Sequence, residues 1–579
     1  MLRSKEIQGL RALAVTLVLL FHAGWLPGGY IGVDVFYVIS GFLITSIIIN
    51  DGDFSFKKFY LRRAKRLLPA AFLVLAATSL AYWFIAPSGA RADFAKELLA
   101  GTWYLSNYFF AYWANDYQNL GAEPSPLVHF WSLAVEEQFY IFWPLLLMLF
   151  TRRRKQLVII VTIASFFFSI YLISVAPIFA FYSLPTRAFE LGLGALIVLY
   201  RIRAKLMNLG IVSILASALI FDESTKFPGI PALFPILGAA MVICSIHNQV
   251  HNEKFRLETI LNSKIAQTIG NWSYSIYLWH WPLLVIPPIY LKRDLGDKEK
   301  LFIIIFCIAI AALTYKFIEN PLRKMQSRDK TLLVSLVASA LLLSGTAFAF
   351  DKTATKSEYS LAKPIIYDNG CHQGYEGYVI KEGCVFGDTQ GNRSIALFGD
   401  SHAAQWFPAL DIWAKRNKFK LYVYTKSSCP ALSLPLKDSG GFIAENCLKF
   451  KANALEEIAT IKPELVVVGN FEHYKVAVTE YLRGENFSFD YLLIRDTPYP
   501  NRDIPICLTS EEDCDTRIPD RIPYKAKNIF DPTPYLCTDK CPAVVDSLLA
   551  YRDRTHITVD MALHLEPRLS EKLDSLVAR

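Results

Sequence analysis

Eleven long runs of apolar residues constrain this chain more than any other feature of its sequence. A helix needs about 20 mainly apolar residues to cross the hydrocarbon core of a bilayer. Charged residues make up only 19% of the chain, below the about 25% of typical soluble proteins. The runs therefore predict a polytopic α-helical membrane domain with about eleven transmembrane helices. Some runs are shorter than 20 residues, and they centre on residues 10–27, 33–50, 70–87, 138–150, 157–175, 183–200, 207–221, 230–246, 270–290, 301–318 and 331–350.

Lys and Arg residues predict the direction of these crossings. Short cytoplasmic loops are rich in Lys and Arg, and here the basic clusters fall in every second loop. An odd number of crossings that starts inside places residues 351–579 outside the cytoplasm. The first run leads straight into a second span, so we expect no cleaved signal peptide. The clusters lie at residues 3–5, 57–66, 152–155, 201–205, 254–256 and 323–330.

Charge and cysteine content both divide the chain near residue 350. Residues 1–350 contain 32 Lys and Arg against 20 Asp and Glu, whereas residues 351–579 contain 28 against 32. The positive excess lies among apolar segments rather than on a soluble basic face, so nucleic-acid binding is excluded. Of the ten cysteines, only Cys244 and Cys307 precede residue 350. Eight cysteines in a polar domain indicate disulfides and an oxidising compartment.

The spacing of these eight cysteines favours disulfides between neighbours. The close pairs are 371–384, 429–447, 507–514 and 537–541, although eight cysteines allow 105 connectivities. The alternative is a tetrathiolate zinc site, for which only Cys537 and Cys541 have ligand-like spacing.

Two polar residues occupy the first apolar run. Arg11 and His22 are eleven positions apart, close to three helical turns, so they share one face about 16 Å apart along the axis. A titratable residue inside a span indicates function. The alternative is an arginine that snorkels to the interface and a histidine that is hydrogen-bonded to a neighbouring helix.

Other spans carry further polar residues. Arg63 and Arg66 belong to a basic cluster that could bind phosphates or only set topology. Glu136 enters the fourth span from outside, and Asp34 begins the second. The remaining three residues have structural interpretations: Arg187 and Glu190, three positions apart, as an ion pair, and His280 as a structural histidine on an aromatic face.

The part after residue 350 contains a second set of candidate catalytic residues. Residues 394–398 predict a buried strand, and Gly-Asp-Ser-His then turns into a helix, which places Ser401 at the head of that helix. There the helix dipole favours an oxyanion. Asp553 and His556 follow near the C-terminus, where His556 could take the serine proton and Asp553 could orient its ring. A serine at a helix start is otherwise often only an N-cap.

The motifs of residues 5–325 resemble the membrane acyltransferase-3 family. They include Gly-Val-Asp-Val-Phe-Tyr, Tyr-Leu-Arg-Arg-Ala-Lys-Arg, Trp-Ser-Leu-Ala-Val-Glu-Glu and Tyr-Ser-Ile-Tyr-Leu-Trp-His-Trp-Pro. The resemblance implies transfer of an acyl group, usually acetyl, from a cytoplasmic donor to an extracytoplasmic acceptor. It also implies roles for five residues: His22 as the essential histidine, Arg11 as its partner, Arg63 and Arg66 as the arginine pair, and Glu136 as the carboxylate.

Residues 360–579 resemble the SGNH hydrolase family, in the version fused to acyltransferase-3 domains. This resemblance implies an α/β three-layer sandwich with a parallel sheet, and Asn470 as oxyanion donor. The family's asparagine block has a residue between Gly and Asn, whereas Gly469 and Asn470 are adjacent here. The second-block glycine would be Gly440 or Gly441. We therefore divide the chain into a ten-helix membrane domain (1–325), an additional transmembrane helix with a linker (326–359) and a periplasmic SGNH-like domain (360–579).

Together these features predict an O-acetyltransferase of the bacterial inner membrane. Acetyl-CoA would be held by Arg11, Arg63 and Arg66, His22 would act as base or relay, tuned by Glu136, and Ser401 would carry the acetyl group. No metal is expected. The acceptor would be a cell-envelope glycan, with the disulfides favouring lipid-linked lipopolysaccharide O-antigen over peptidoglycan. The rival functions are a glycan acetyl esterase and a glycan transporter with an outer binding module.

Overall fold

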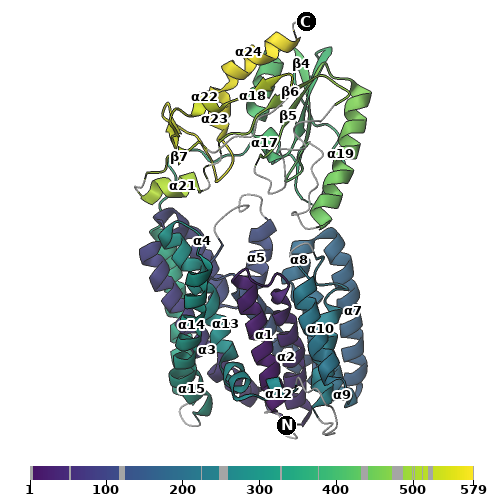
Figure 1. Cartoon of the computed structure of the whole chain (residues 1–579), viewed down its shortest axis with the longest axis vertical. Helices are drawn as coiled ribbons and strands as arrows, with labels where there is room; N and C mark the ends of the chain where they lie inside the picture. The colour runs from purple at the N-terminus through teal and green to yellow at the C-terminus, as the bar shows by residue number, and fades with distance from the viewer. Residues whose placement is uncertain are drawn as a thin grey trace. The chain divides into compact units, whose positions relative to one another are not determined.

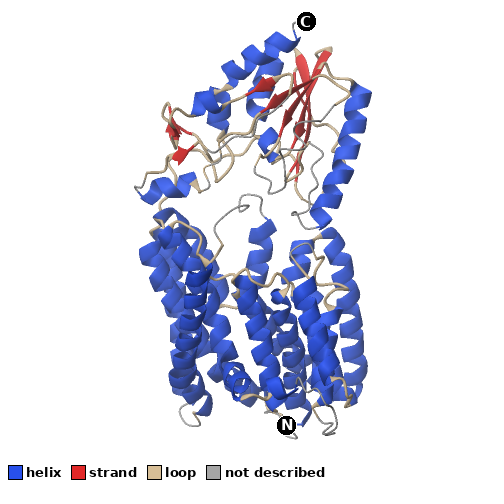
Figure 2. Cartoon of the chain, in the orientation of Figure 1, coloured by secondary structure: helices blue, strands red, loops and turns tan. Residues whose placement is uncertain are grey.

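The computed structural model describes residues 4–577 apart from 51–53, 116–123, 223–224, 247–257, 326–328, 376, 432–440, 473–486, 499, 501, 511–512 and 519–525. The chain forms two compact units (Figure 1). The first contains Met1–Ala86, Ala90–Asp116 and Glu123–Ala354, and the second contains Pro87–Gly89, Tyr117–Ala122 and Thr355–Arg579. Helices build the first unit, and all the described strands belong to the second (Figure 2).

Each of the eleven apolar runs overlaps one long helix of the first unit. A segment in lipid must satisfy its backbone N–H and C=O groups internally, which an α-helix does. The eleven helices are α1 Lys5–His22, α2 Gly32–Asn50, α3 Phe56–Ile85, α6 Phe130–Leu149, α7 Arg154–Val175, α9 Leu184–Tyr200, α10 Met207–Ile220, α11 Leu233–Ser245, α13 Lys264–Leu291, α14 Asp297–Thr314 and α16 Asp329–Lys352. Shorter helices are α4 Arg91–Thr102, α5 Ser106–Asn115, α8 Pro177–Tyr182, α12 Glu258–Leu261 and α15 Asn320–Lys324.

Six helical segments among the described residues are long and apolar enough to cross a membrane. They are Gly29–Asn50, Phe56–Ile85, Phe130–Leu149, Thr151–Val175, Asp297–Lys324 and Asp329–Lys352. Helices α10 and α11 are apolar but shorter. The predicted helical membrane domain is thus confirmed, whereas the count of eleven crossings stays a prediction.

Helix α1 ends earlier than its apolar run. The run extends to residue 27, but the helix ends at His22. Gly24 adopts a φ of +77°, and a left-handed residue of this kind terminates helices at little cost only when it is glycine. His22 therefore lies in the last turn of α1.

Helix α1 also packs closely against α13. A Cβ atom at Gly270 of α13 would lie 2.0 Å from the backbone oxygen of Gln8 in α1. Only a residue without a side chain permits this approach, which is how small residues bring membrane helices together. The contact fixes the two helices that carry His22 and His280.

A buried ion cluster joins α2 to α9. Arg187 lies 2.8 Å from both Glu190 and Asp34, and all three side chains are at most 1% exposed. The predicted pair of Arg187 and Glu190 is therefore confirmed, and Asp34 is its third member. Removing one partner of such a cluster leaves a buried charge uncompensated, so we assign it to structure.

The second unit is built on a seven-stranded sheet. The strand order is β1-β4-β3-β5-β6-β8 with all neighbours parallel, and β2 pairs antiparallel to β4. The strands are β1 His372–Gln373, β2 Val385–Gly387, β3 Arg393–Gly399, β4 Phe419–Lys426, β5 Leu465–Gly469, β6 Tyr491–Ile494 and β8 Ile529–Phe530. Two small ribbons pair β7 Thr516–Arg517 with β9 Lys540–Cys541, and β10 Val544–Val545 with β11 Leu548–Leu549.

Helices cover both faces of this sheet (Figure 1). The helices of this unit are α17 Ser401–Ala404, α18 Phe407–Asn417, α19 Gly441–Ile461, α21 Ile504–Cys507, α22 Thr533–Leu536, α23 Val559–His564 and α24 Glu566–Val577. Successive strand residues point to opposite faces: Leu397 packs in one apolar cluster with Trp413 of α18, and Phe398 packs in another with Phe450 of α19. The predicted three-layer α/β sandwich is confirmed.

The four predicted disulfides are present in this unit. They join Cys371 to Cys384, Cys429 to Cys447, Cys507 to Cys514 and Cys537 to Cys541. Cys537 and Cys541 therefore belong to a disulfide, and the zinc alternative is wrong. Cys244 and Cys307 are free and buried in the helical unit.

Candidate active sites of the two units

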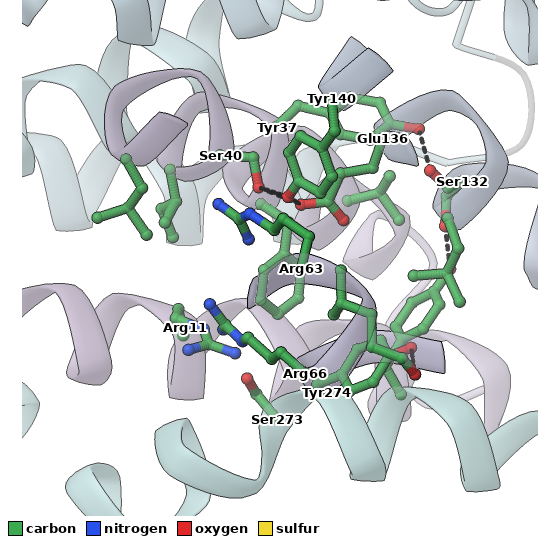
Figure 3. Close-up of a pocket in the computed structure, with 17 residues that line it drawn as sticks. Arg11, Tyr37, Ser40, Arg63, Arg66, Ser132, Glu136, Tyr140, Ser273 and Tyr274 are labelled. Atoms are coloured by element: carbon green, nitrogen blue, oxygen red, sulfur yellow. Dashed lines mark hydrogen bonds between the residues drawn. The ribbon is translucent and has the colours of Figure 1, made fainter. Parts of the chain in front are cut away.

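Helices of the first unit line a polar pocket (Figure 3). Arg11 comes from α1, Ser40 from α2, Arg63 and Arg66 from α3, and Glu136 from α6. The structure thus brings together four predicted site residues, which come from three helices.

Hydroxyl groups anchor Glu136 in this pocket. The hydroxyls of Ser40 and Tyr140 both donate to Glu136 Oε1. The guanidinium of Arg63 stacks over the Tyr140 ring, 4.5 Å from its centroid. This stacking fixes the plane of the guanidinium, and with it the directions of its N–H donors.

The pocket carries a positive excess. Its lining includes three guanidinium groups and one carboxylate. The buried Nε of Arg66 has no hydrogen-bond partner among the residues that the structure describes. Phosphate oxygens would supply the missing acceptors, because arginine binds phosphate through paired, charge-assisted hydrogen bonds. The residues present therefore fit a phosphate-bearing ligand.

A cluster of histidines surrounds the C-terminal end of α1. His22 Nδ1 lies 3.0 Å from His280 Nε2 in α13. The His22 ring also packs edge-on against Trp281 at 4.6 Å, and the ring of His129 lies 5.5 Å from that of His280. His280, interpreted from sequence as structural, is thus in direct contact with the predicted catalytic histidine.

Glu136 and His22 belong to different clusters. Glu136 makes its hydrogen bonds in the arginine pocket, which Arg11 lines and His22 does not. His22 is three turns of α1 beyond Arg11, about 16 Å along the axis. The expectation that Glu136 tunes His22 therefore lacks support from this geometry.

Tyr277 connects the pocket to the histidines. Its side chain lines the pocket, and its hydroxyl lies 2.5 Å from Ser132 Oγ and donates to the carbonyl of His129 at 3.1 Å. Its own carbonyl lies 2.5 Å from His280 Nδ1. Tyr277 therefore lines the arginine pocket with one part of the residue and contacts His280 with another.

In the second unit, Ser401 lies where a parallel strand meets a helix. Strand β3 ends at Gly399, and Ser401 is the first residue of α17. Asp400 caps this helix by accepting a 2.8 Å hydrogen bond from the His402 amide. Gly399 has a φ of +149°, and a Cβ there would lie 2.0 Å from the Gly469 oxygen. The turn that positions Ser401 thus requires glycine.

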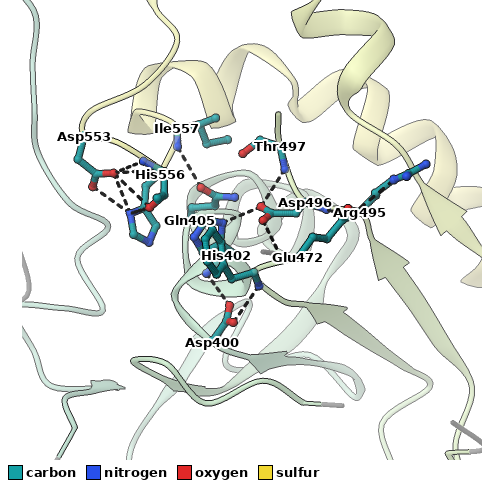
Figure 4. Close-up of polar contacts among 12 residues, drawn as sticks. Asp400, His402, Gln405, Glu472, Arg495, Asp496, Thr497, Asp553, His556 and Ile557 are labelled. Atoms are coloured by element: carbon teal, nitrogen blue, oxygen red, sulfur yellow. Dashed lines mark hydrogen bonds and ion pairs between the residues drawn. The ribbon is translucent and has the colours of Figure 1, made fainter. Parts of the chain in front are cut away.

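Asp553 and His556 form the predicted hydrogen-bonded pair (Figure 4). His556 Nδ1 donates to Asp553 Oδ2 at 2.9 Å, and the His556 amide donates to Asp553 Oδ1 at 2.8 Å. Burial lowers the pKa of His556 to about 4, which Asp553 opposes and His402 reinforces. Burial alone would raise the pKa of Asp553, but the histidine beside it holds that pKa below its ordinary value. At neutral pH His556 is therefore a neutral base, oriented by a carboxylate.

Two contacts tie the segment of Ser401 to that of His556. Gln405, one turn after Ser401, accepts a 3.0 Å hydrogen bond from the Ile557 amide. The ring of His402 lies 4.5 Å from the ring of His556, at 34° to it (Figure 4). The helix that begins with Ser401 therefore lies beside the segment of Asp553 and His556, and the role of Ser401 itself stays a prediction.

His402 forms a second histidine–carboxylate pair beside the first. Its Nδ1 lies 2.6 Å from Asp496 Oδ1, and both side chains are at most 4% exposed. The amide of Glu472 donates to Asp496 Oδ2 at 3.0 Å. Burial lowers the pKa of His402, but the charge and hydrogen bond of Asp496 outweigh it, so this pKa is raised.

Asn470 reaches the same edge of the sheet. It follows Gly469, which pairs in register with Gly399. The side-chain oxygen of Asn470 accepts a 2.6 Å hydrogen bond from the Ala431 amide. That bond fixes the orientation of the amide group. Gly441 begins α19, whereas Gly440 lies outside the described residues.

Sequence reasoning missed several residues of both sites. Tyr277 and Ser132 lie within motifs of the acyltransferase-3 family. A tyrosine or a serine in an apolar helix does not indicate a functional side chain by its residue type alone. Asp496 follows the buried strand β6, and a carboxylate after a parallel strand would have been a usable signal. The missed residues are Ser40, Ser132, Tyr140, Tyr277, His402 and Asp496.

The two units together define a class of protein: a polytopic helical membrane protein joined to an α/β domain whose Asp553–His556 pair lies beside the helix that begins with Ser401. The sequence profile of the acyltransferase-3 family, described as an acyltransferase domain, matches residues 4–318. This match covers more than half of the chain, which therefore belongs to the acyltransferase-3 family. The profile of the SGNH domain fused to such domains matches residues 370–501, a range that ends before Asp553 and His556.

Named relatives are similar to just over half of the chain. The chain is 33% identical over 368 residues to the Bacillus subtilis protein named "Putative peptidoglycan O-acetyltransferase YrhL", covering 56% of this chain and 55% of that protein. It is 31% identical over 353 residues to the peptidoglycan O-acetyltransferase OatA of Listeria monocytogenes, covering 55% and 56%. The chain spans about half the length of the curated relatives it matches.

One solved structure also matches. It is the periplasmic domain of a lipopolysaccharide acetyltransferase from Salmonella ser. Paratyphi A, at 17% identity with a TM-score of 0.25, covering 33% of this chain and 86% of that one. A likeness this low carries no argument about function.

Proposed function

We propose that this chain transfers an acetyl group from acetyl-CoA to a hydroxyl of a cell-envelope glycan. One observation carries the proposal: an acyltransferase-3 domain with three arginines in one pocket is joined to a domain in which the Asp553–His556 pair lies beside the helix that begins with Ser401. The first arrangement fits a phosphate-bearing donor. The second fits an acyl-enzyme intermediate.

The proposed location is the bacterial inner membrane, with a cytoplasmic N-terminus. Basic residues mark alternate loops as cytoplasmic, and four disulfides in the second unit favour an oxidising periplasm. We assign residues 1–325 to the acyltransferase domain, 326–359 to an added transmembrane helix with its linker, and 360–579 to the periplasmic domain. The boundary between the compact units at residues 354–355 supports this division.

In the membrane domain, Arg11, Arg63 and Arg66 hold the phosphates of acetyl-CoA. Arginine suits this role because its planar fork binds phosphate oxygens in pairs. His22 acts as the base or relay that passes the acetyl group outward. Tyr277 lines the arginine pocket and contacts His280 through its backbone carbonyl.

In the periplasmic domain, Ser401 takes the acetyl group. Its Oγ bonds to the acyl carbon as the bond to the previous carrier breaks, while His556 takes the serine proton and passes it to the leaving group. A sugar hydroxyl then attacks the acyl carbon, gives its proton to His556 and displaces Ser401 Oγ, which regains a proton. Asp553 keeps the ring of His556 oriented through both steps.

Two acceptors fit this mechanism. The disulfides favour a Gram-negative periplasm, and with it lipid-linked lipopolysaccharide O-antigen. The names of the relatives from Bacillus subtilis and Listeria monocytogenes favour peptidoglycan instead. Mass spectrometry of lipopolysaccharide and of digested peptidoglycan, from cells with and without the protein, separates the two, because only the true acceptor loses its acetyl groups.

Ser401→Ala tests the division of work between the domains. Cells with only this variant should lack glycan acetylation, while membranes should still consume acetyl-CoA in the first step. Ser394→Ala, at the start of the same strand, is the matched control and should behave as the parent. Parental acetylation by Ser401→Ala would mean that the outer domain only binds acceptor. An esterase would instead leave more acetyl on the glycan when Ser401 is lost, and a transporter would be indifferent to it.

A further inference from the structure

We propose that His280 is a positioning residue that fixes the tautomer of His22, so that Nε2 of His22 carries the lone pair that serves as base. The inference rests on the proposed role of His22. It follows from a chain of two hydrogen bonds, from His22 to His280 and from His280 to the carbonyl of Tyr277.

The first bond sets the tautomer of His280. Its Nδ1 lies 2.5 Å from the carbonyl oxygen of Tyr277, one turn earlier in α13. A carbonyl oxygen can only accept a hydrogen bond, so Nδ1 of His280 must carry the hydrogen. In a neutral imidazole the other nitrogen then holds a lone pair. His280 Nε2 is therefore an acceptor.

The surroundings of His280 favour its neutral form. The residue is 1% exposed, and its ring contacts are the imidazoles of His22 and His129 and the phenol of Tyr277. None of these rings supplies a negative charge. Burying an imidazolium among them would be costly, because a buried charge needs a partner of opposite sign.

The second bond passes this tautomer to His22. His280 Nε2 accepts from His22 Nδ1 across 3.0 Å, so the hydrogen of His22 resides on Nδ1. Nε2 of His22 is left with the lone pair and can take a proton. The hydrogen bond made by one ring nitrogen commonly decides the state of the other. In this site a neutral histidine, His280, accepts the hydrogen bond from Nδ1 of His22. In the second unit the Asp553 carboxylate accepts the corresponding hydrogen bond from Nδ1 of His556.

Three substitutions at position 280 separate positioning from packing. Glutamine places an amide oxygen near the position of Nε2 and can still accept from His22. Asparagine places its amide nitrogen near Nδ1, so it can still donate to Tyr277 but cannot reach His22. Leucine does neither. The matched control is Cys307→Ala, which removes a 3.7 Å contact to the Ile276 carbonyl on the same helix and leaves the histidines untouched.

Glycan acetylation by the full chain in membranes is the first readout. We expect His280→Gln to keep activity within about tenfold of the parent, and His280→Asn and His280→Leu to lose about 10²- to 10⁴-fold. An imposed wrong tautomer costs a serine protease about 10⁴-fold. Cys307→Ala should match the parent. The proposal is wrong if the His280→Asn variant is at least as active as the His280→Gln variant. That result would mean that the contact of residue 280 with Tyr277 supports activity and its contact with His22 does not.

Nitrogen NMR of the histidine-labelled full chain gives a second readout that does not depend on activity. The ring-nitrogen signals of His22 are assigned as those that disappear from the spectrum of the His22→Ala variant. We expect Nδ1 of His22 to be protonated in the parent and in His280→Gln, and this preference to be lost in His280→Leu. Protonation on Nε2 in the parent would overturn the proposal. Full activity of His22→Ala would instead remove the proposed role of His22, whatever its tautomer.

Discussion

Removing both charges of the His402–Asp496 pair should move the acid limit of acetyl-ester cleavage upward by about one pH unit. Cleavage through Ser401 requires neutral His556, so activity falls as the pH drops through the pKa of His556, which is about 4. A protonated His402 disfavours a second positive charge on His556 and thus extends activity toward lower pH. The change is the double substitution His402→Gln and Asp496→Asn.

The distances in the structure give the size of this shift. The rings of His402 and His556 lie 4.5 Å apart, and at an effective dielectric constant of about 20 two unit charges at that separation repel by about 3.7 kcal/mol. The Asp496 carboxylate, 2.6 Å from His402 Nδ1, attracts a charged His556 and offsets about two thirds of this repulsion. The remainder, about 1.3 kcal/mol, corresponds to about one pH unit. The acid limit should therefore move to about pH 5.

The assay is acetate release from a small activated acetyl ester by the detergent-solubilised full chain, with kcat/KM measured between pH 3.5 and 8. His402→Gln alone leaves the Asp496 carboxylate in place, so its acid limit should lie above that of the double variant. Ser401→Ala gives the background rate. An acid limit that stays at about pH 4 in both variants would show that His402 does not act on His556 and would refute this reasoning.

Three further predictions concern the rest of the chain. Alkaline phosphatase fused after residue 350 should be active and the same fusion after Lys155 inactive, because this enzyme works only outside the cytoplasm; the reverse pattern would contradict the topology. Arg63→Lys should raise the KM for acetyl-CoA about tenfold because a point charge cannot reproduce paired phosphate contacts, whereas the exposed Arg62→Lys should match the parent; equal KM values would exclude Arg63 from the donor site. Replacing Cys429 and Cys447, 18 residues apart, by alanine should lower the free energy of unfolding by about 3 kcal/mol, seen as a lower urea midpoint, and an unchanged midpoint would contradict it.

The sequence alone determined the features that depend on local pattern. An apolar run in lipid must be a helix, because no other spanning structure of one segment satisfies its backbone, and all eleven runs overlap helices. The disulfides join cysteines that are near in sequence, where closing the loop costs little entropy. The contact of Asp553 with His556 is also local, since three residues separate them.

The tertiary structure decided which distant side chains meet. His22 and His280 are 258 positions apart, and their contact depends on the rotation and depth of α1 against α13, which a hydropathy pattern leaves open. The same holds for Glu136, which faces the arginines rather than His22, and for His402, whose partner Asp496 lies at the end of another strand. Hydrophobic burial specifies the faces of helices and strands, but it is non-directional. The partners of polar side chains are fixed only when the packed backbones bring donors and acceptors within about 3 Å.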